Sequence, residues 1–343
     1  MPTMNFKRRL PIPQEIREEM PLSAELVEKK KEFDASVAAV ITGESPKKLL
    51  VIGPCSADRE DSVLDYVTRL AGLQEKVADK FVIVPRVYTN KPRTKGTGYK
   101  GLLHQPDPEG ESDLLAGIKA IRHMHLRVIE ETGFFTADEQ LYPANYRFLF
   151  DLLAYVAIGA RSVENQEHRQ VASGMEVPVG MKNPTGGSLS VMLNSIYAAQ
   201  QVQTFIYRNW DVTSTGNPYA HAVLRGYQGF DGRNHPNYHY EHLERLSNAY
   251  LEGDYQNPAV IVDCNHDNSG KRPFEQIRIC KEVLDSCRRN ADIAKIFRGF
   301  MIESYIEDGN QPVDGEVYGK SITDPCLGWD KTERLVLELA DRL

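Results

Sequence analysis

The stretch LLVIGPC at residues 49–55 sets the pattern of the fold, because four consecutive aliphatic residues are followed by the small and polar residues that end a strand. Further runs of this kind follow along the chain, most of them separated by helix-like segments. They are FVIVPR (81–86), FFTADE (134–139), AIGAR (157–161), VPVGMK (177–182), HAVLR (221–225), AVIVDCNH (259–266) and GFMIE (299–303). Short apolar strands alternating with helices are typical of a parallel sheet buried on both faces, and eight such units predict an α/β fold, a closed (β/α)8 TIM barrel. The pair QTFIYRN (203–209) and WDVTST (210–215) predicts an inserted β-hairpin.

The predicted catalytic barrel covers residues 46–343 and leaves residues 1–45 as an N-terminal extension. Four prolines within residues 1–22 predict an extended arm. In residues 23–42 the apolar side chains recur at helical spacing, and Ser23 stands where an N-cap is expected. Because the apolar stripe of this helix needs cover, we expect the extension to serve subunit assembly or regulation.

Charge and composition exclude several classes of function. The 343 residues carry a net charge of −7, which argues against sequence-independent binding of nucleic acid or of an acidic membrane surface. No apolar stretch approaches the length of a membrane-spanning helix or the core of a secretion signal. The five cysteines are too scattered for a disulfide scaffold, so the sequence predicts a cytoplasmic protein.

The residues that end the predicted strands carry most of the chemistry. They are Cys55, Arg86, Glu139, Arg161, Lys182, Arg225, His266 and Glu303. In a TIM barrel the carboxyl ends of all strands meet at one mouth, where active sites are built. Four of these residues are Arg or Lys in a protein that is acidic overall, which indicates a local basic cluster for an anionic ligand.

The stretch PRVYTNKPRTKGTGYKG (85–101) extends this basic cluster. It adds Lys91, Arg93, Lys95 and Lys100, and its glycines would let backbone N–H groups approach an anion closely. Phosphorylated substrates are therefore predicted.

A candidate metal site combines one thiol, one imidazole and two carboxylates. Its members are Cys55, His266, Glu303 and Asp324. Mixed sulfur, nitrogen and oxygen ligands suit a divalent transition metal such as Mn²⁺, Fe²⁺, Co²⁺ or Zn²⁺, and the ligand types do not choose among the four.

These motifs together resemble one enzyme family. The matching stretches are GPCS (53–56), RVYTNKPRT (86–94), GARS (159–162), PVGMKN (178–183), LRG (224–226), NHDNSGK (265–271), MIESY (301–305) and GKSITDPCLGW (319–329). They resemble the type I 3-deoxy-D-arabino-heptulosonate 7-phosphate (DAHP) synthases, and the likeness runs from about residue 10 to the end of the chain. The resemblance implies a metal-dependent condensation of phosphoenolpyruvate with erythrose 4-phosphate that releases phosphate, the first step of the shikimate pathway to aromatic amino acids.

The resemblance also implies roles for individual residues. The family's metal ligands fall on the four residues of the candidate metal site. Its phosphoenolpyruvate-binding residues fall on Arg86, Lys100, Gly159, Ala160, Arg161, Lys182 and Arg225. The family's erythrose 4-phosphate loop falls on Lys91, Pro92, Arg93 and Thr94. Tyr99 and MKNPTGG (181–187) depart from the usual family residues, which affects loop detail and leaves the charged residues intact.

Several points of mechanism and control stay open at this stage. Either Lys91 or a metal-bound water is a reasonable proton source for the new alkoxide, and Glu139 is a candidate to position the water that attacks C2. The resemblance implies a homodimer or homotetramer in which the N-terminal segment and the region around Pro143 form a feedback site for Phe, Tyr or Trp.

Two other readings compete with this assignment. One is a related synthase that uses arabinose 5-phosphate, and the KPRT loop at 91–94 argues against it. The other is a non-catalytic anion sensor, and the presence of all the matched metal ligands and basic residues argues against it.

Overall fold

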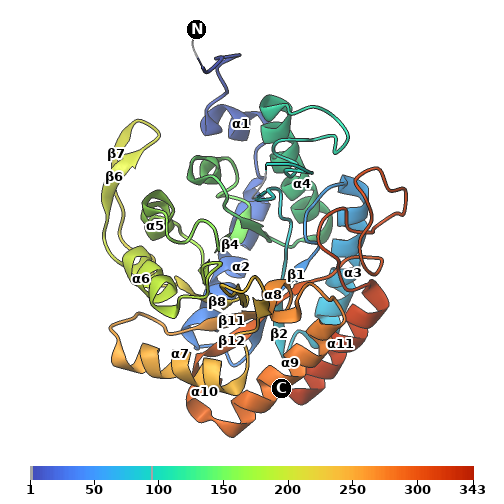
Figure 1. Ribbon diagram of the computed structural model, residues 1–343. Helices are drawn as coiled ribbons and strands as arrows, with labels where there is room; N and C mark the ends of the chain where they lie inside the picture. Colours follow the sequence, from blue (N-terminus) through green and yellow to red (C-terminus); the bar gives the residue numbers. More distant parts are fainter. Residues whose placement is uncertain (1–2, 94–95) are drawn as a thin grey trace.

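A computed structural model describes residues 3–93 and 96–343, and its centre is a barrel of parallel strands ringed by helices (Figure 1). Within the described residues the barrel strands pair in the order β2-β1-β12-β11-β8-β5-β4-β3. Their bounds are β1 Lys48–Gly53, β2 Phe81–Pro85, β3 Thr136–Glu139, β4 Leu153–Ile158, β5 Val179–Lys182, β8 His221–Leu224, β11 Val260–Asp263 and β12 Phe297–Glu303. A parallel bridge between Arg86 and Ala137 joins the two outer strands of this order, so the sheet closes on itself. The predicted (β/α)8 TIM barrel is confirmed.

The strands form because their side chains face apolar layers on both sides. All residues of β2, β4, β5, β8 and β11 are buried, as a parallel sheet inside a ring of helices requires. The surrounding helices are α3 Glu60–Val77, α4 Leu114–Thr132, α5 Gln166–Ser173, α6 Leu189–Gln200, α7 Tyr240–Glu252, α9 Glu275–Arg289, α10 Ala291–Ile296 and α11 Trp329–Arg342. Two short helices, η1 Pro143–Phe148 and α8 His266–Ser269, lie in the loops after β3 and β11. No helix of the described chain is both long enough and apolar enough to cross a membrane.

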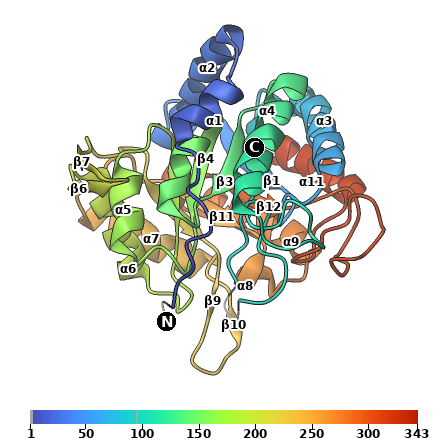
Figure 2. The same ribbon diagram turned by 90° about the horizontal axis from the view of Figure 1, so that it is seen from above.

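The N-terminal extension contributes two helices, α1 Pro13–Glu19 and α2 Ala24–Thr42. The prediction for α2 is confirmed, since the Ser23 hydroxyl accepts a hydrogen bond from the Leu26 N–H at its start. Its apolar stripe is buried against the barrel, because Val37 is fully buried and the Arg298 side chain donates to the carbonyl of Ile41. Figure 2 shows α2 at one end of the barrel and the β9–β10 hairpin at the opposite end.

Two details of the predicted architecture are wrong. The arm is not extended throughout, because Pro13 begins helix α1, whose first turn is stabilised by the Glu15 carboxylate accepting from the Ile12 N–H. The fourth strand is β4, which begins before the predicted run at 157–161 and ends at Ile158. The residues from Leu153 onward form one continuous apolar run, and periodicity alone cannot tell such a run from a buried helix.

The structure confirms one inserted hairpin and adds another. Strands β6 Thr204–Tyr207 and β7 Trp210–Thr213 form the predicted hairpin as an antiparallel pair. A second antiparallel pair, β9 Tyr227–Gln228 and β10 Asn234–His235, follows the carboxyl end of β8. Strands of two residues carry no periodicity, so the sequence pattern did not show this hairpin.

Candidate active site at the barrel mouth

A cavity of about 320 Å³ opens where the barrel strands end. It is lined by most of the predicted site residues, namely Cys55, Arg86, Lys91, Pro92, Arg93, Glu139, Ala160, Arg161, Lys182, Arg225, His266, Glu303 and Asp324. Lys100 and Gly159 are not among the lining residues, and Thr94 lies outside the described residues. Barrel closure therefore brings residues from positions 55 to 324 into one space.

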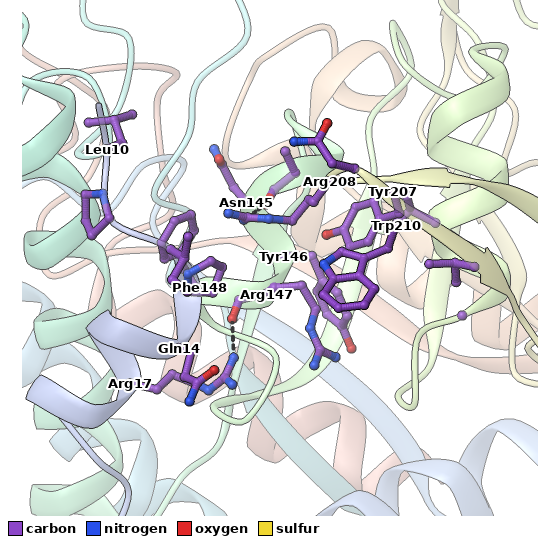
Figure 3. Close-up of a pocket in the computed structure, with 18 of the residues that line it drawn as sticks. Leu10, Gln14, Arg17, Asn145, Tyr146, Arg147, Phe148, Tyr207, Arg208 and Trp210 are labelled. Carbon is purple, nitrogen blue, oxygen red and sulfur yellow. Dashed lines mark hydrogen bonds between the residues drawn. The ribbon is translucent and has the colours of Figure 1, made fainter. Parts of the chain in front are cut away.

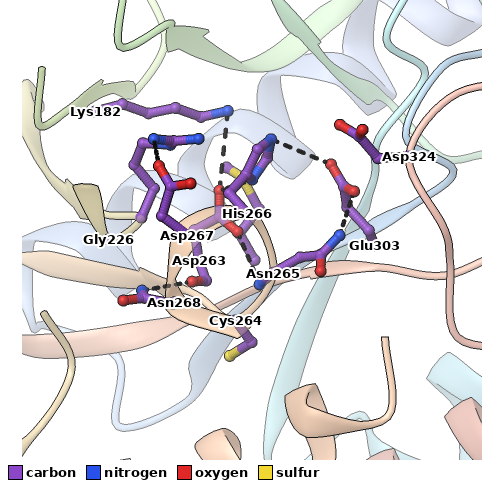
Figure 4. Close-up of polar contacts among 12 residues, drawn as sticks. Lys182, Gly226, Asp263, Cys264, Asn265, His266, Asp267, Asn268, Glu303 and Asp324 are labelled. Carbon is purple, nitrogen blue, oxygen red and sulfur yellow. Dashed lines mark hydrogen bonds and ion pairs between the residues drawn. The ribbon is translucent and has the colours of Figure 1, made fainter. Parts of the chain in front are cut away.

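The predicted metal ligands lie together in one corner of this cavity. Ligand atoms of Cys55, Glu303 and Asp324 all lie within 4.8 Å of one another. The fourth member, His266, places Nε2 at 3.5 Å from Oε1 of Glu303 (Figure 4). Cys55 and Glu303 are buried and Asp324 is half-buried, so an ion here would be largely shielded from water.

Lys91 lies beside this corner and contacts two of its members. Its Nζ is 2.8 Å from Sγ of Cys55 and 2.9 Å from Oδ2 of Asp324. Burial and the nearby Glu303 raise the pKa of the Cys55 thiol to about 11. Burial alone would lower the pKa of Lys91, but Cys55 and Asp324 more than offset it and leave that pKa well above its usual value. The Lys91 ammonium thus balances part of the negative charge of a corner whose side chains suit a cation.

Asp263 is a site residue that the sequence reasoning missed. It is the last residue of β11, is fully buried and places Oδ2 at 2.8 Å from Nδ1 of His266 (Figure 4). Burial would raise the pKa of Asp263, but His266 and Lys182 hold it well below the usual range, so the carboxylate is charged. This pair directs the other ring nitrogen of His266 toward the metal corner. A signal was present, because Asp263 ends a strand like the residues that were selected.

A basic wall of the cavity adjoins the metal corner and centres on Arg86. This guanidinium is 1% exposed and donates through Nη2 to Oε1 of Glu303 at 3.0 Å. Its Nε and Nη1 have no hydrogen-bond partner among the described residues. Its carbon Cζ lies 4.0 Å from the centre of the Tyr88 ring. Two buried donors without a partner are expected where an anionic ligand belongs.

Lys182 and Glu139 form a buried ion pair next to Arg86. Nζ of Lys182 lies 2.8 Å from Oε2 of Glu139. Burial would raise the pKa of Glu139, but Lys182, His266 and Arg86 lower it to about 2. Glu139 is therefore a charged acceptor at neutral pH. It also explains Gly159, since a Cβ there would lie 2.6 Å from Oε1 of Glu139.

Asparagine side chains fix the backbone around Arg225. The N–H of Arg225 donates to Oδ1 of Asn183 at 2.9 Å, and that same oxygen accepts from Nδ2 of Asn237 at 3.0 Å. The N–H of Asn237 in turn donates to Oδ1 of Asn268, which fixes the position of Asn237. The Arg225 guanidinium pairs with Asp267. These contacts hold one basic side chain in place without filling the cavity.

The loop after β2 turns back on itself to present Lys91 and Arg93. Nε of Arg93 donates to the Tyr99 carbonyl at 2.8 Å, and the N–H of Lys91 donates to the Lys100 carbonyl at 3.1 Å. The close approach needs Gly101, whose φ is +93° and whose added Cβ would lie 2.5 Å from the Thr89 carbonyl oxygen. Lys100 thus shapes this loop through its backbone.

A second and larger cavity, of about 780 Å³, is lined by described residues none of which line the active-site cavity. Figure 3 shows this second cavity. We call it the arm cavity, and its walls come from the N-terminal residues 10–14 with Arg17, from residues 144–148, from α5 and from the β6–β7 hairpin. Arg17 donates to the carbonyl of Arg147 at 3.0 Å, which joins α1 to η1.

Comparison with known proteins identifies the family. The sequence model of the DAHP synthetase I family matches residues 22–337. The chain belongs to this family. The enzyme class predicted from the sequence, a 3-deoxy-7-phosphoheptulonate synthase, is confirmed by this membership.

Individual relatives are similar to this chain over most of their length. The Trp-sensitive phospho-2-dehydro-3-deoxyheptonate aldolase of Escherichia coli K12 is 36% identical over 312 residues, 89% of this chain and 86% of the relative. The Tyr-sensitive aldolase of the same organism is 34% identical over 336 residues, 95% of this chain and 91% of the relative. A solved structure of a phospho-2-dehydro-3-deoxyheptonate aldolase from Francisella tularensis superposes with a TM-score of 0.92 at 28% identity, covering 99% of this chain and 98% of that one.

Proposed function

We propose that this protein catalyses the metal-dependent condensation of phosphoenolpyruvate with erythrose 4-phosphate to give DAHP and phosphate. The observation that carries the proposal is one cavity that joins a cluster of cationic side chains to a cluster of metal-ligand types. Two phosphorylated substrates need two basic pockets, and a reaction that builds negative charge on oxygen needs stabilisation where that charge develops.

The residues present fit a divalent metal. Cys55, His266, Glu303 and Asp324 would hold it, and the ammonium of Lys91 between Cys55 and Asp324 supports the preference of this donor set for positive charge. When bound, a divalent ion supplies Lewis-acid polarisation of a carbonyl oxygen. Metal binding must displace the proton that the raised pKa of Cys55 keeps on its sulfur, so affinity should increase with pH.

The basic wall would hold phosphoenolpyruvate. Arg86 has two buried donors without a partner in the described part of the chain, and Lys182, Arg225 and Arg161 line the same cavity. A planar guanidinium binds a carboxylate or a phosphate through two parallel hydrogen bonds. Holding the enol ester rigidly would place its C3 for attack on the aldehyde carbon of the second substrate.

The loop after β2 would hold erythrose 4-phosphate. Lys91, Pro92 and Arg93 line the cavity beside the metal corner, and Thr94 follows them in the family's motif. The Arg93 side chain is oriented by its bond to the Tyr99 carbonyl, which leaves further guanidinium donors for a phosphate.

Lys91 would donate a proton in the reaction, and Glu139 would orient the attacking water. Lys91 keeps its proton at neutral pH, because Cys55 and Asp324 hold its pKa high, and its place beside the metal corner supports a role as the proton donor to the new alkoxide. The charged Glu139 accepts hydrogen bonds and would orient the water that adds to C2 of phosphoenolpyruvate. Cleavage of the bond between C2 and the phosphate oxygen then releases phosphate.

A phosphate-release assay tests this function. We expect phosphate release from phosphoenolpyruvate with erythrose 4-phosphate, none with arabinose 5-phosphate, and none after treatment with a chelator until metal is restored. Release with arabinose 5-phosphate alone would identify the related synthase, and release with neither sugar would favour a non-catalytic anion sensor.

We propose that the arm cavity binds an aromatic amino acid as a feedback effector. Its walls combine the Phe148 ring with the guanidinium groups of Arg17, Arg147 and Arg208, which suit an aromatic side chain and a carboxylate respectively. The names of the Trp-sensitive and Tyr-sensitive relatives support this proposal. Calorimetric titration with Phe, Tyr and Trp tests it, and the absence of binding by all three would refute it.

We propose that the protein assembles as a homodimer or homotetramer. Phe6 on the arm is 91% exposed, and Ile206 and Trp210 on the β6–β7 hairpin are 81% and 74% exposed. Large apolar side chains gathered on projecting segments are typical of an interaction surface. Light scattering should give a multiple of the chain mass that falls in an Ile206→Ser, Trp210→Ser variant, whereas a monomeric wild type would contradict the proposal.

A further inference from the structure

A small chamber of about 20 Å³ lies between the active-site cavity and the arm cavity. Asn90 and Glu139 line both the chamber and the active-site cavity. Asn145 and Tyr146 line both the chamber and the arm cavity. The chamber therefore shares one wall with the substrate site and another with the proposed effector site.

Two residues that line the chamber carry buried polar atoms without a partner among the described residues. Both the Nε2 and the Oε1 of Gln140, and the Oδ1 of Asn90, have no hydrogen-bond partner in the part of the chain that the structure describes. Gln140 is 7% exposed and Asn90 is 6% exposed. Native proteins rarely leave buried donors and acceptors unpaired, because each such atom keeps its full cost of desolvation.

The backbone of Gln140 cannot relieve this deficit by moving. Its N–H donates to the Ala157 carbonyl at 2.9 Å, which fixes the residue at the end of β3. The chamber wall also includes the apolar side chains of Ile121, Leu149 and Val156 and the Tyr146 hydroxyl, which likewise has no hydrogen-bond partner in the described chain. Among the described residues no side chain completes the hydrogen bonds of the Gln140 amide, and a small polar molecule in the chamber would do so.

The volume and the polar atoms suit one water molecule. A buried water needs about 10–15 Å³ of accessible space and two to four polar partners. The chamber offers about 20 Å³ together with an amide donor, an amide acceptor on Gln140 and a second acceptor on Asn90. A water in the chamber would supply hydrogen bonds to Gln140 and Asn90.

We propose that one ordered water in this chamber, bound by Gln140 and Asn90, couples the arm cavity to the substrate site, with Gln140 as the positioning residue. This inference rests on the effector function proposed for the arm cavity. Two elements that contact each other through a water can move relative to one another at a lower cost in free energy than two elements with close-packed side chains.

The chain connectivity makes this coupling direct. Gln140 follows Glu139, whose carboxylate accepts from Lys182 at 2.8 Å. Asn90 precedes Lys91, which contacts two of the proposed metal ligands. On the other side, Tyr146 belongs to η1, which lines the arm cavity. A ligand that displaces η1 would thus change the water's contacts with two residues that each adjoin a substrate-binding side chain.

The test compares Gln140→Met, which keeps the length of the side chain and removes both polar ends, with Gln74→Met as a matched control. Gln74 lies on α3 and bonds the backbone of Phe81 and Ile83, away from the chamber. For each protein, calorimetry measures the dissociation constant of the amino acid among Phe, Tyr and Trp that binds the wild type. The titration is done with and without saturating phosphoenolpyruvate. The ratio of the two constants is the coupling between the sites, typically 5–150-fold in allosteric proteins.

We expect Gln140→Met to bind each ligand alone with a dissociation constant within about threefold of the wild-type value. Its coupling ratio should be at least about fivefold smaller than that of the wild type. Gln74→Met should keep the wild-type ratio even where its melting temperature falls. An unchanged ratio in Gln140→Met, with effector binding intact, would overturn the coupling role and leave the effector site standing.

Crystallography tests the water independently of regulation. We expect density in the wild-type chamber within hydrogen-bond distance of Gln140 and Asn90, and none in Gln140→Met. An empty wild-type chamber, at a resolution that shows other buried waters, would overturn the proposal. If Phe, Tyr and Trp all fail to bind the wild type, the effector function and the coupling both fail, whatever the chamber holds.

Discussion

Replacing Asp263 with asparagine should weaken metal binding more than it weakens substrate binding. The Asp263 carboxylate is fully buried and lies 2.8 Å from Nδ1 of His266, whereas Nζ of Lys182 is 3.9 Å away. Asparagine keeps the size of the side chain and removes its charge, so His266 loses the charged partner that holds its ring and raises its basicity.

The size of the effect follows from these distances. Loss of such a partner of a metal-binding histidine typically costs 10–100-fold in metal affinity, or about 1.4 to 2.7 kcal/mol. Lys182 keeps its closer partner Glu139 at 2.8 Å, so the KM for phosphoenolpyruvate should change less than the metal dissociation constant. Asp263 would thus act on the metal through His266.

Metal titration of the chelator-treated protein measures the change, with Mn²⁺ followed by calorimetry or Co²⁺ by visible absorption. Asp138→Asn is the matched control, because Asp138 is a buried carboxylate near the end of β3 that accepts from the Thr89 N–H. We expect near wild-type metal affinity in that control. The reasoning is refuted if Asp263→Asn binds metal as tightly as the wild type, or if both variants lose the same affinity.

Further predictions concern the metal, the substrates, pH and the N-terminal arm. Cys55→Ala should leave the fold intact by circular dichroism while elemental analysis shows bound metal well below one ion per chain; full stoichiometric metal would contradict the four-ligand site. Arg93→Ala should raise the KM for erythrose 4-phosphate by at least about tenfold with little change for phosphoenolpyruvate, and Arg225→Ala should do the reverse, since each removes a charged hydrogen bond to one substrate; equal effects on both substrates would count against separate pockets. Burial lowers the pKa of His221 from 6.5 to about 4, so the folded protein favours the neutral ring; its contribution to stability is complete above pH 6.5 and is lost as the pH falls toward 4, by up to about 3 kcal/mol. Urea unfolding between these pH values should show a steeper loss for the wild type than for His221→Gln, and parallel curves would disprove the assignment. Removing residues 1–22 should leave metal binding and turnover close to wild type while changing the oligomeric mass and any inhibition by Phe, Tyr or Trp; a truncated protein that assembles and responds like the full chain would remove the regulatory role of the arm.

The amino-acid sequence by itself determined the barrel and the residues at its mouth. Short aliphatic runs that end in polar residues are a local property of the chain, and barrel geometry brings such ends together whatever the intervening loops do. Selecting Cys55, Arg86 and Glu303 required only that they end strands and carry suitable chemistry. The same local patterns predicted helix α2 and the β6–β7 hairpin, and both are present.

The sequence misplaced one element and missed others because their signal is short or ambiguous. The sequence pattern predicts the fourth strand at 157–161 and the strand lies at Leu153–Ile158, because only the pairing of β4 with β3 and β5 fixes where a strand begins within a continuous apolar run. Strands β9 and β10 have two residues each, so only their pairing with one another defines them.

Only the tertiary structure decided which site residues contact one another. The contact of Lys91 with Cys55 and Asp324 joins positions separated by 36 and 233 residues, and it depends on the register of β1 and β12 and on the loop after β2. The sequence also gives no sign that the Gln140 amide lacks a hydrogen-bond partner among the described residues, because a glutamine after a strand is usually exposed. Hydrogen bonds require positions accurate to a fraction of an ångström, and periodicity fixes only which face of an element a residue occupies.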